Sequence, residues 1–85
     1  MNIDVQQTPN PDTLKFVLSL ELVQNGSMEF KNSVEANEYP FVQKIFQLGA
    51  ELVFFGNNFI SVKKNSGTQW NEISEKIQDI IKNDF

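Results

Sequence analysis

Three carboxylates recur with helical spacing near the end of the chain, at Glu72, Glu75 and Asp79. At positions i, i+3 and i+7 they would share one band of a helix, because side chains three or four residues apart lie on the same face. Oxygen ligands so arranged could hold a hard cation such as Mg²⁺, Ca²⁺ or Fe²⁺. Solvated helix faces carry the same pattern, and Lys76 and Lys82 supply counter-charges nearby. We therefore prefer a solvated face and keep a weak iron site there as the alternative.

The other chemical groups in the sequence form a narrow inventory. There is no Cys and no His, which excludes thiolate metal sites, zinc sites, Ser-His-Asp triads and Cys-His pairs. No Ser or Thr has a histidine base to activate it. The glycines stand singly at positions 26, 49, 56 and 67, so a glycine-rich phosphate loop is excluded as well. We predict no catalytic residue, no enzyme activity and no cofactor bound by this chain.

Charge and hydropathy narrow the classes of partner. The formal net charge is −4, and the seven basic residues are all lysines. Nucleic-acid binding needs a basic footprint, so we expect none. The longest apolar run, 52–55, is far shorter than the roughly 20 residues that span a bilayer. Residues 1–7 do not resemble a signal peptide, so we expect a cytoplasmic protein without membrane contact. The pair Lys63 and Lys64 is predicted to make a strand edge soluble.

Alternating apolar and polar residues predict the strands of the first half. We expect strands over 2–7 and 13–23, then a turn over 24–27 and a short edge strand over 28–30. The segment 8–12 is rich in Pro, Asn and Asp, residues that break strands and form turns. We therefore predict a rigid connector here, in preference to a binding motif.

Two amphipathic segments predict helices. The first is expected within 36–48, beginning near Pro40 and ending before Gly49, since Pro suits the first helical turn and Gly the residue after the last. The second is expected over 69–83, with Thr68 as its N-cap. Both helices carry an apolar face that must be buried against a sheet.

The segment 51–64 is typical of a β-hairpin, with two apolar runs around a turn at 56–58. Gly and Asn reach positive φ at low cost, so a tight turn is expected there. A two-residue loop would pair Phe55 with Ile60, whereas a three-residue loop would pair Phe54 with Ile60, and both registers remain open. Side chains alternate along a strand, so one of the two phenylalanines must face away from the core in either register.

These elements predict one domain over residues 1–85 with the order β-β-β-α-β-β-α. The predicted class is α+β, a two-layer sandwich whose mostly antiparallel sheet has two helices packed on one face. The opposite face would then carry Val17 and one of the hairpin phenylalanines. Apolar groups on such a face mark a protein contact, or they are covered by the loop 31–39 or by a second copy of the chain.

Several motifs together resemble the N-terminal domain of the Nfu (NifU-like) iron–sulfur cluster proteins. They are T-P-N-P-D-T-L-K-F (8–16), Y-P-F-V (39–42), V-F-F-G-N-N-F-I-S-V-K-K (53–64) and the following Trp70. The resemblance covers essentially the whole chain. The sequence departs from the family pattern at Val17-Leu18-Ser19, where Pro-Gly is usual, and at Tyr39-Pro40, where Ser-Pro is common.

The resemblance implies a role in iron–sulfur cluster assembly or delivery. In the family a second domain holds the cluster with a Cys-x-x-Cys pair, so the cluster belongs to the wider system and not to this chain. The implied partners are iron–sulfur assembly or acceptor proteins, including a Cys-x-x-Cys cluster domain in cis or in trans. A homodimeric structural or regulatory protein is a further alternative. The candidate partner contacts are Thr8, Pro9, Asn10, Pro11 and Asp12 in the connector, and Phe54, Phe55 and Phe59 in the hairpin.

Overall fold

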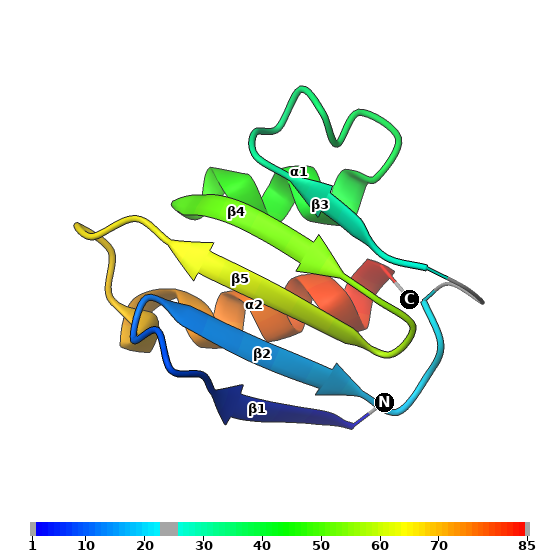
Figure 1. Ribbon diagram of the computed structural model, residues 1–85, viewed down its shortest axis with the longest axis horizontal. Helices are drawn as coiled ribbons and strands as arrows, with labels where there is room; N and C mark the ends of the chain where they lie inside the picture. The colour runs from blue at the N-terminus through cyan, green and yellow to red at the C-terminus, as the bar shows by residue number, and fades with distance from the viewer. Residues whose placement is uncertain (1, 23–25, 85) are drawn as a thin grey trace.

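The computed structural model describes residues 2–22 and 26–84 of the chain. Its elements, in chain order, are β1 (Ile3–Gln7), β2 (Thr13–Leu18), β3 (Met28–Phe30), α1 (Pro40–Gln47), β4 (Ala50–Phe55), β5 (Phe59–Lys64) and α2 (Trp70–Asp84) (Figure 1). The predicted order β-β-β-α-β-β-α is confirmed.

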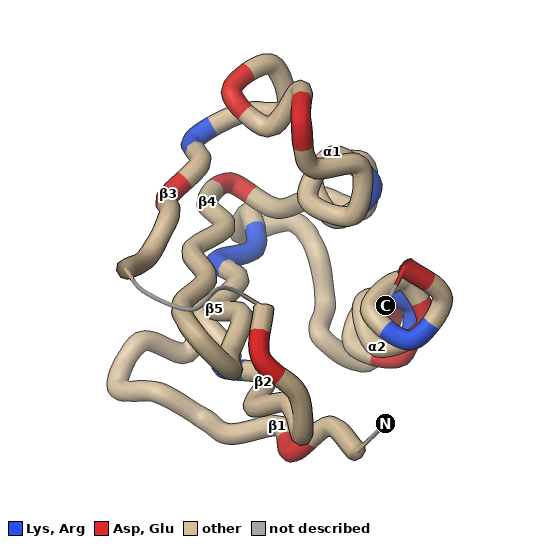
Figure 2. The backbone as a smooth tube through the Cα atoms, turned by 90° about the vertical axis from the view of Figure 1, so that its right-hand side faces the viewer, with Lys and Arg blue, Asp and Glu red and all other residues tan. Residues whose placement is uncertain are grey.

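The strands form one five-stranded sheet in the order β1-β2-β5-β4-β3, and every neighbouring pair is antiparallel. Both helices lie on the same face of this sheet, as the view along its edge shows (Figure 2). The predicted α+β class with two layers is therefore confirmed. We call the face under the helices the inner face and the other the outer face.

The core lies between the inner face and the helices. Ile60 of β5 is the centre of a row, because it pairs with Phe16 of β2 on one side and with Phe55 of β4 on the other. All three side chains are at most 1% exposed. The helices close the core with residues one helical turn apart, which are Phe41, Val42 and Ile45 of α1 and Ile73, Ile77 and Ile81 of α2.

An aromatic cluster joins the β3 edge to the start of α1. The Tyr39 ring lies 5.4 Å from the Phe30 ring and 5.5 Å from the Phe55 ring, measured between centroids. Tyr39 is the N-cap residue of α1, and Pro40 follows at the first helical position as predicted. Packing of aromatic pairs at these separations anchors the segment before α1 onto the inner face.

The hairpin of β4 and β5 adopts the two-residue register. Phe55 pairs with Ile60, and the Gly56 N–H donates to the Phe59 carbonyl at 3.1 Å. The expectation of positive φ in this turn is wrong, because no described residue has a positive φ except Gly26 and Gly49. Gly56 is needed for space instead, since a Cβ there would lie 2.5 Å from the Phe59 ring.

Strand β2 is shorter than predicted, ending at Leu18 instead of residue 23. The two neighbouring strands, β1 and β5, have no residues beyond this point to pair with β2. Leu18 pairs with Ile3, the first residue of β1, and the Leu18 N–H donates to the Asn58 carbonyl in the hairpin turn before β5. A strand without a partner on either side has no ladder to continue. Leu20 and Leu22 still pack against the core. Residues 23–25 of the predicted strand and turn lie outside the described part of the chain.

Helix α2 begins one residue later than predicted, and Thr68 is not its N-cap. The helix starts at Trp70, and the Thr68 hydroxyl donates to the Asn65 side-chain oxygen at 2.8 Å. The same oxygen accepts from the Gly67 N–H at 2.9 Å. Asn65 therefore organises the loop before α2 as an Asx turn. The Thr68 hydroxyl bonds to Asn65 in this turn and not to the first N–H groups of the helix. Within residues 2–22 and 26–84 no helix is long and apolar enough to cross a membrane.

Gly49 is the residue after α1 whose replacement should be most disruptive. Its φ is +113°, and a Cβ there would lie 2.7 Å from the Thr68 hydroxyl oxygen. We expect Gly49→Ala to lower the free energy of unfolding by about 1–3 kcal/mol, because it adds backbone strain and a clash. Chemical denaturation would measure this. Gly67→Ala is the matched control, since a Cβ there meets only the Asn65 oxygen at 3.5 Å; equal losses in both variants would contradict the prediction.

Candidate functional site

Two phenylalanines lie side by side on the outer face. The Phe54 and Phe59 ring centroids are 5.7 Å apart with an interplanar angle of 33°, and Phe59 pairs across the ladder with Val17 of β2. The Lys15 ammonium lies 4.6 Å from the Phe59 ring centroid, a cation–π geometry. We call Lys15, Val17, Phe54 and Phe59 the outer patch. Each is half-buried, because its neighbours in the patch cover part of it.

The outer patch lies on the three central strands β2, β5 and β4, and no described helix covers it (Figure 2). The loop 31–39 does not cover it either. Ala36 of that loop is fully buried in the core, and Figure 2 shows the loop at the β3 edge, joining β3 to α1. Of the two coverings that the sequence suggested, the loop is therefore excluded for the described residues.

Phe55 does not belong to this surface. It is 1% exposed and packs on the inner face against the Phe30 and Phe41 rings, at centroid distances of 5.9 and 5.6 Å. The two-residue register is the reason, since it places Phe55 beside Ile60 and turns Phe54 outward. Phe55 is thus removed from the candidate contacts.

The connector between β1 and β2 is held in one conformation by its own polar groups. The Thr8 hydroxyl donates toward the Asn10 and Thr13 carbonyls at 2.9 Å each and accepts from the Asn10 N–H. The Asn10 side-chain oxygen accepts from the Asp12 N–H at 2.9 Å. Pro9, Asn10 and Pro11 are exposed. This Asx-turn chemistry makes the connector rigid, as the composition indicated.

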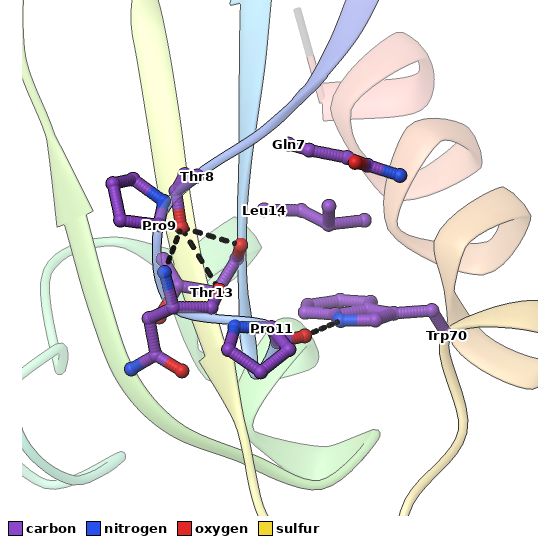
Figure 3. A pocket seen from close by; sticks show the side chains of 8 residues that line it. Gln7, Thr8, Pro9, Pro11, Thr13, Leu14 and Trp70 are labelled. Carbon is purple, nitrogen blue, oxygen red and sulfur yellow. Dashed lines mark hydrogen bonds between the residues drawn. The ribbon is translucent and has the colours of Figure 1, made fainter.

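A pocket of about 240 Å³ lies where the connector meets the start of α2. Residues 7–11, Thr13, Leu14 and Trp70 line it, and Figure 3 shows Gln7 and Leu14 extending toward α2 on the same side as the Trp70 ring. The indole N–H of Trp70 donates to the Pro11 carbonyl at 3.0 Å, and the ring meets Phe16 edge-on with centroids 6.5 Å apart. Trp70 therefore joins the connector to the core.

Asp12 ties the other end of the connector to the central strand. Its carboxylate lies 3.0 Å from the Lys64 ammonium, and its carbonyl accepts from the Lys64 N–H at 2.8 Å. The Lys64 residue is only 8% exposed. The expectation that Lys63 and Lys64 form a solubilising edge is wrong, because β5 is the central strand of the sheet. Lys63 faces outward instead and pairs at 3.9 Å with Glu51.

The three carboxylates on the acidic face of α2 do not converge on one point. Glu72, Glu75 and Asp79 are exposed on the helix. In the described ranges, 2–22 and 26–84, no three His, Cys, Asp or Glu side chains gather closely enough to hold a metal ion. A single helix face supplies few converging oxygens, and among the described residues no further carboxylate joins these three.

Three residues that matter at these sites were not identified from the sequence as site residues. Lys15 sits on the Phe59 ring, Trp70 forms a wall of the pocket, and Lys64 pairs with Asp12. The alternation in β2 predicts that Lys15 lies on the outer face, so its place on that surface could be predicted from the sequence. Its contact with Phe59 depends on the pairing of β2 with β5, which sequence periodicity does not reveal.

A family model described as "Scaffold protein Nfu/NifU N terminal" matches residues 3–85. The chain belongs to this family. The Nfu/NifU N-terminal resemblance expected from the T-P-N-P and hairpin motifs is therefore confirmed.

Individual proteins and solved structures of this family are also similar to the chain. The chain is 33% identical over 87 residues to the "NFU1 iron-sulfur cluster scaffold homolog, mitochondrial" of Drosophila erecta, and 34% identical over 79 residues to a NifU-like protein of Schizosaccharomyces pombe. These matches cover 100% and 89% of the chain but only 31% and 30% of the relatives. Protein SAV1430 of Staphylococcus aureus is similar over 95% of this chain and 99% of its own, with a TM-score of 0.81 and 26% identity. A NifU-like protein of Saccharomyces cerevisiae is similar over 94% of this chain and 74% of its own, with a TM-score of 0.83 and 30% identity.

Removing the charge of Asp12 should destabilise the fold, because the Lys64 side chain beside it is only 10% exposed and its ammonium would be left without its counter-charge. We expect Asp12→Asn to lower the free energy of unfolding by about 1–2 kcal/mol, a value reduced for the partial exposure of Asp12. Asp84→Asn is the matched control, since its partner Lys44 is 52% exposed, and it should cost less than about 0.5 kcal/mol. A larger loss in the control would contradict this assignment.

The acidic face of α2 should not bind iron specifically. We expect isothermal titration with ferrous iron under anaerobic conditions to show no saturable binding in the micromolar range, because the carboxylates do not converge. The double variant Glu72→Gln/Glu75→Gln should give the same heats as the native chain. Saturable binding that this variant abolishes would restore the iron site.

Proposed function

We propose that this chain is a non-catalytic interaction module that contacts proteins of iron–sulfur cluster assembly or delivery. Family membership supports the cellular context, since relatives matched over the whole chain are named as iron–sulfur cluster scaffold homologues. The chain has no Cys or His, so the cluster is cargo held by other ligands. The partner that best fits this arrangement is a Cys-x-x-Cys domain that holds the cluster, in cis or in trans.

The observation that carries the proposal is the uncovered outer patch. Paired aromatic rings are frequent anchors of protein interfaces, because they bury a large area for little loss of side-chain freedom. Phe54 and Phe59 stand on central strands and are held against each other, so they lose little further freedom on binding. The described part of the chain buries neither ring completely.

The charges around the two rings are of both signs. Lys15 lies over Phe59, and Lys63 on the same face is paired with Glu51. Asp4 stands across the ladder from Val17, and Glu29 from Phe54, so both acidic residues lie on this face as well. A partner surface with an apolar centre and a polar rim of mixed charge would complement this arrangement. The exposed, rigid residues Pro9, Asn10 and Pro11 offer a second contact at the end of β1, with the Trp70 pocket beside them.

An NMR titration tests the outer patch. We expect a Cys-x-x-Cys cluster domain of the same family, or an apo-acceptor, to shift the amide signals of Lys15, Val17, Phe54 and Phe59 in the ¹⁵N-labelled chain. Phe54→Ser should weaken binding by about tenfold or more, since it removes an interface anchor. The fold should persist, because Phe54 lies outside the core.

Val34→Ser is the matched control for that variant. Val34 is an apolar residue 81% exposed on the loop 31–39, so its replacement makes the same kind of change away from the patch. Binding should be unaffected. Shifts confined to α2, or equal weakening by the two variants, would refute the outer patch as the contact.

A further inference from the structure

The two edges of the sheet differ in how well they are protected. Edge strands expose unpaired backbone groups, which proteins normally blunt with short strands, bulges, Pro or Lys. β3 is only three residues long. β1 is five residues long, reads I-D-V-Q-Q, and pairs with β2 in an uninterrupted register. In the described part of the chain nothing pairs with its other side, and Figure 1 shows it as the open margin of the sheet.

The ladder determines which backbone groups of β1 point outward. The Ser19 N–H donates to the Asn2 carbonyl, so the backbone groups of Asn2 face β2. These directions alternate along an antiparallel strand. Asp4 and Gln6 therefore also face β2, and the N–H and C=O groups of Ile3, Val5 and Gln7 point away from the sheet, available for a further strand.

The side chains of these same three residues lie on the inner face, where β1 extends past the helix layer. Figure 1 shows α2 behind β5 and β2, with β1 beyond it. Val5 is consequently 38% exposed, one of two large apolar residues exposed in the described ranges. The margin at β1 thus combines outward-facing hydrogen-bonding groups with an uncovered apolar side chain.

We propose that β1 pairs with β1 of a second copy of this chain, antiparallel and about a two-fold axis at Val5. Val5 then faces Val5 of the second copy, and Ile3 faces Gln7 of the second copy. Every outward-facing N–H and C=O of the three residues finds a partner in this arrangement, and the two sheets become continuous. The contact is isologous, so it closes as a dimer and does not propagate.

Charge selects this register over its neighbours. Centring the pair on Val5 places Asp4 opposite Gln6 of the second copy, and Gln6 already donates to Asp4 at 2.9 Å within one strand. Shifting the axis to Asp4 would set two carboxylates directly opposite each other, which is unfavourable. Shifting it to Gln6 would leave Ile3 without a partner. Only the Val5 axis uses the whole strand without opposing like charges.

The proposed dimer is a weak and reversible one. Pairing of two five-residue strands buries far less than the roughly 1,200–2,000 Å² of a stable interface. It uses an edge that the outer patch does not include, so it leaves that patch accessible. Its test needs no other protein, and failure of the dimer would leave the proposed function untouched.

Sedimentation equilibrium over low micromolar to roughly millimolar concentration should show a monomer–dimer equilibrium. Val5→Lys should lower the association constant by about tenfold or more, because it opposes two ammonium groups at the axis. Val34→Lys makes the same change on an exposed loop and should leave association unchanged. A chain that stays monomeric throughout, or that associates equally well as Val5→Lys, overturns the proposal.

Disulfide trapping tests the register independently and does not depend on the Lys variant folding. The chain has no cysteine, so each single Cys variant reports on one position. Val5→Cys should cross-link fastest under mild oxidation, because directly opposite residues have Cα atoms within disulfide reach. Asp4→Cys and Val34→Cys should cross-link slowly. Faster cross-linking of Asp4→Cys, or equal rates at all three positions, contradicts an axis at Val5.

Discussion

The position of β5 between β2 and β4 is the constraint on which the rest of the molecule depends. Both ladders must keep their register for Phe16, Ile60 and Phe55 to stand in one row beneath the helices. A slip of one residue in either ladder would exchange the two faces of a strand. The outer patch follows from the same register, because the residues between the core positions are the ones that face out. Core and contact surface are therefore two results of one pairing pattern.

The connector between β1 and β2 depends on this frame as well. Its hydrogen bonds make it rigid, but Asp12 and Trp70 fix where it stands. Asp12 is tied to Lys64 at the end of the central strand, and Trp70 reaches the Pro11 carbonyl from the start of α2. One of the motifs that carry the family resemblance is thus a structural joint between the sheet and the second helix, as well as a candidate contact.

Local patterns in the sequence predicted the fold almost completely. The alternation of Leu14, Phe16 and Leu18, the Pro40 start of α1 and the two hairpin runs each depend on nearby residues, and all appear in the structure. The end of β2 was misplaced because Leu20 and Leu22 keep the alternation while their strand partners have run out. Lys64 was misassigned because its place in the centre of the sheet, and its contact with Asp12, depend on pairing between distant segments.

The candidate sites were less accessible to such reasoning. Alternation established that one of Phe54 and Phe55 must face outward, but only the turn geometry at Gly56 decides which one. The cation–π contact of Lys15 and the Trp70 pocket each combine residues from elements far apart in the chain. The helical spacing of Glu72, Glu75 and Asp79 is real, yet spacing on one helix does not create the convergence that a metal ion requires.

Trp70 is the chain's single tryptophan, and it stands at the joint between the connector and α2. Indole emission from the native chain therefore originates at one place, with Phe16 behind the ring and the Pro11 carbonyl at its N–H. Its wavelength and quenching depend on how far solvent reaches the ring at that joint. The molecule carries an intrinsic optical probe for occupancy of the adjoining pocket, without any added label.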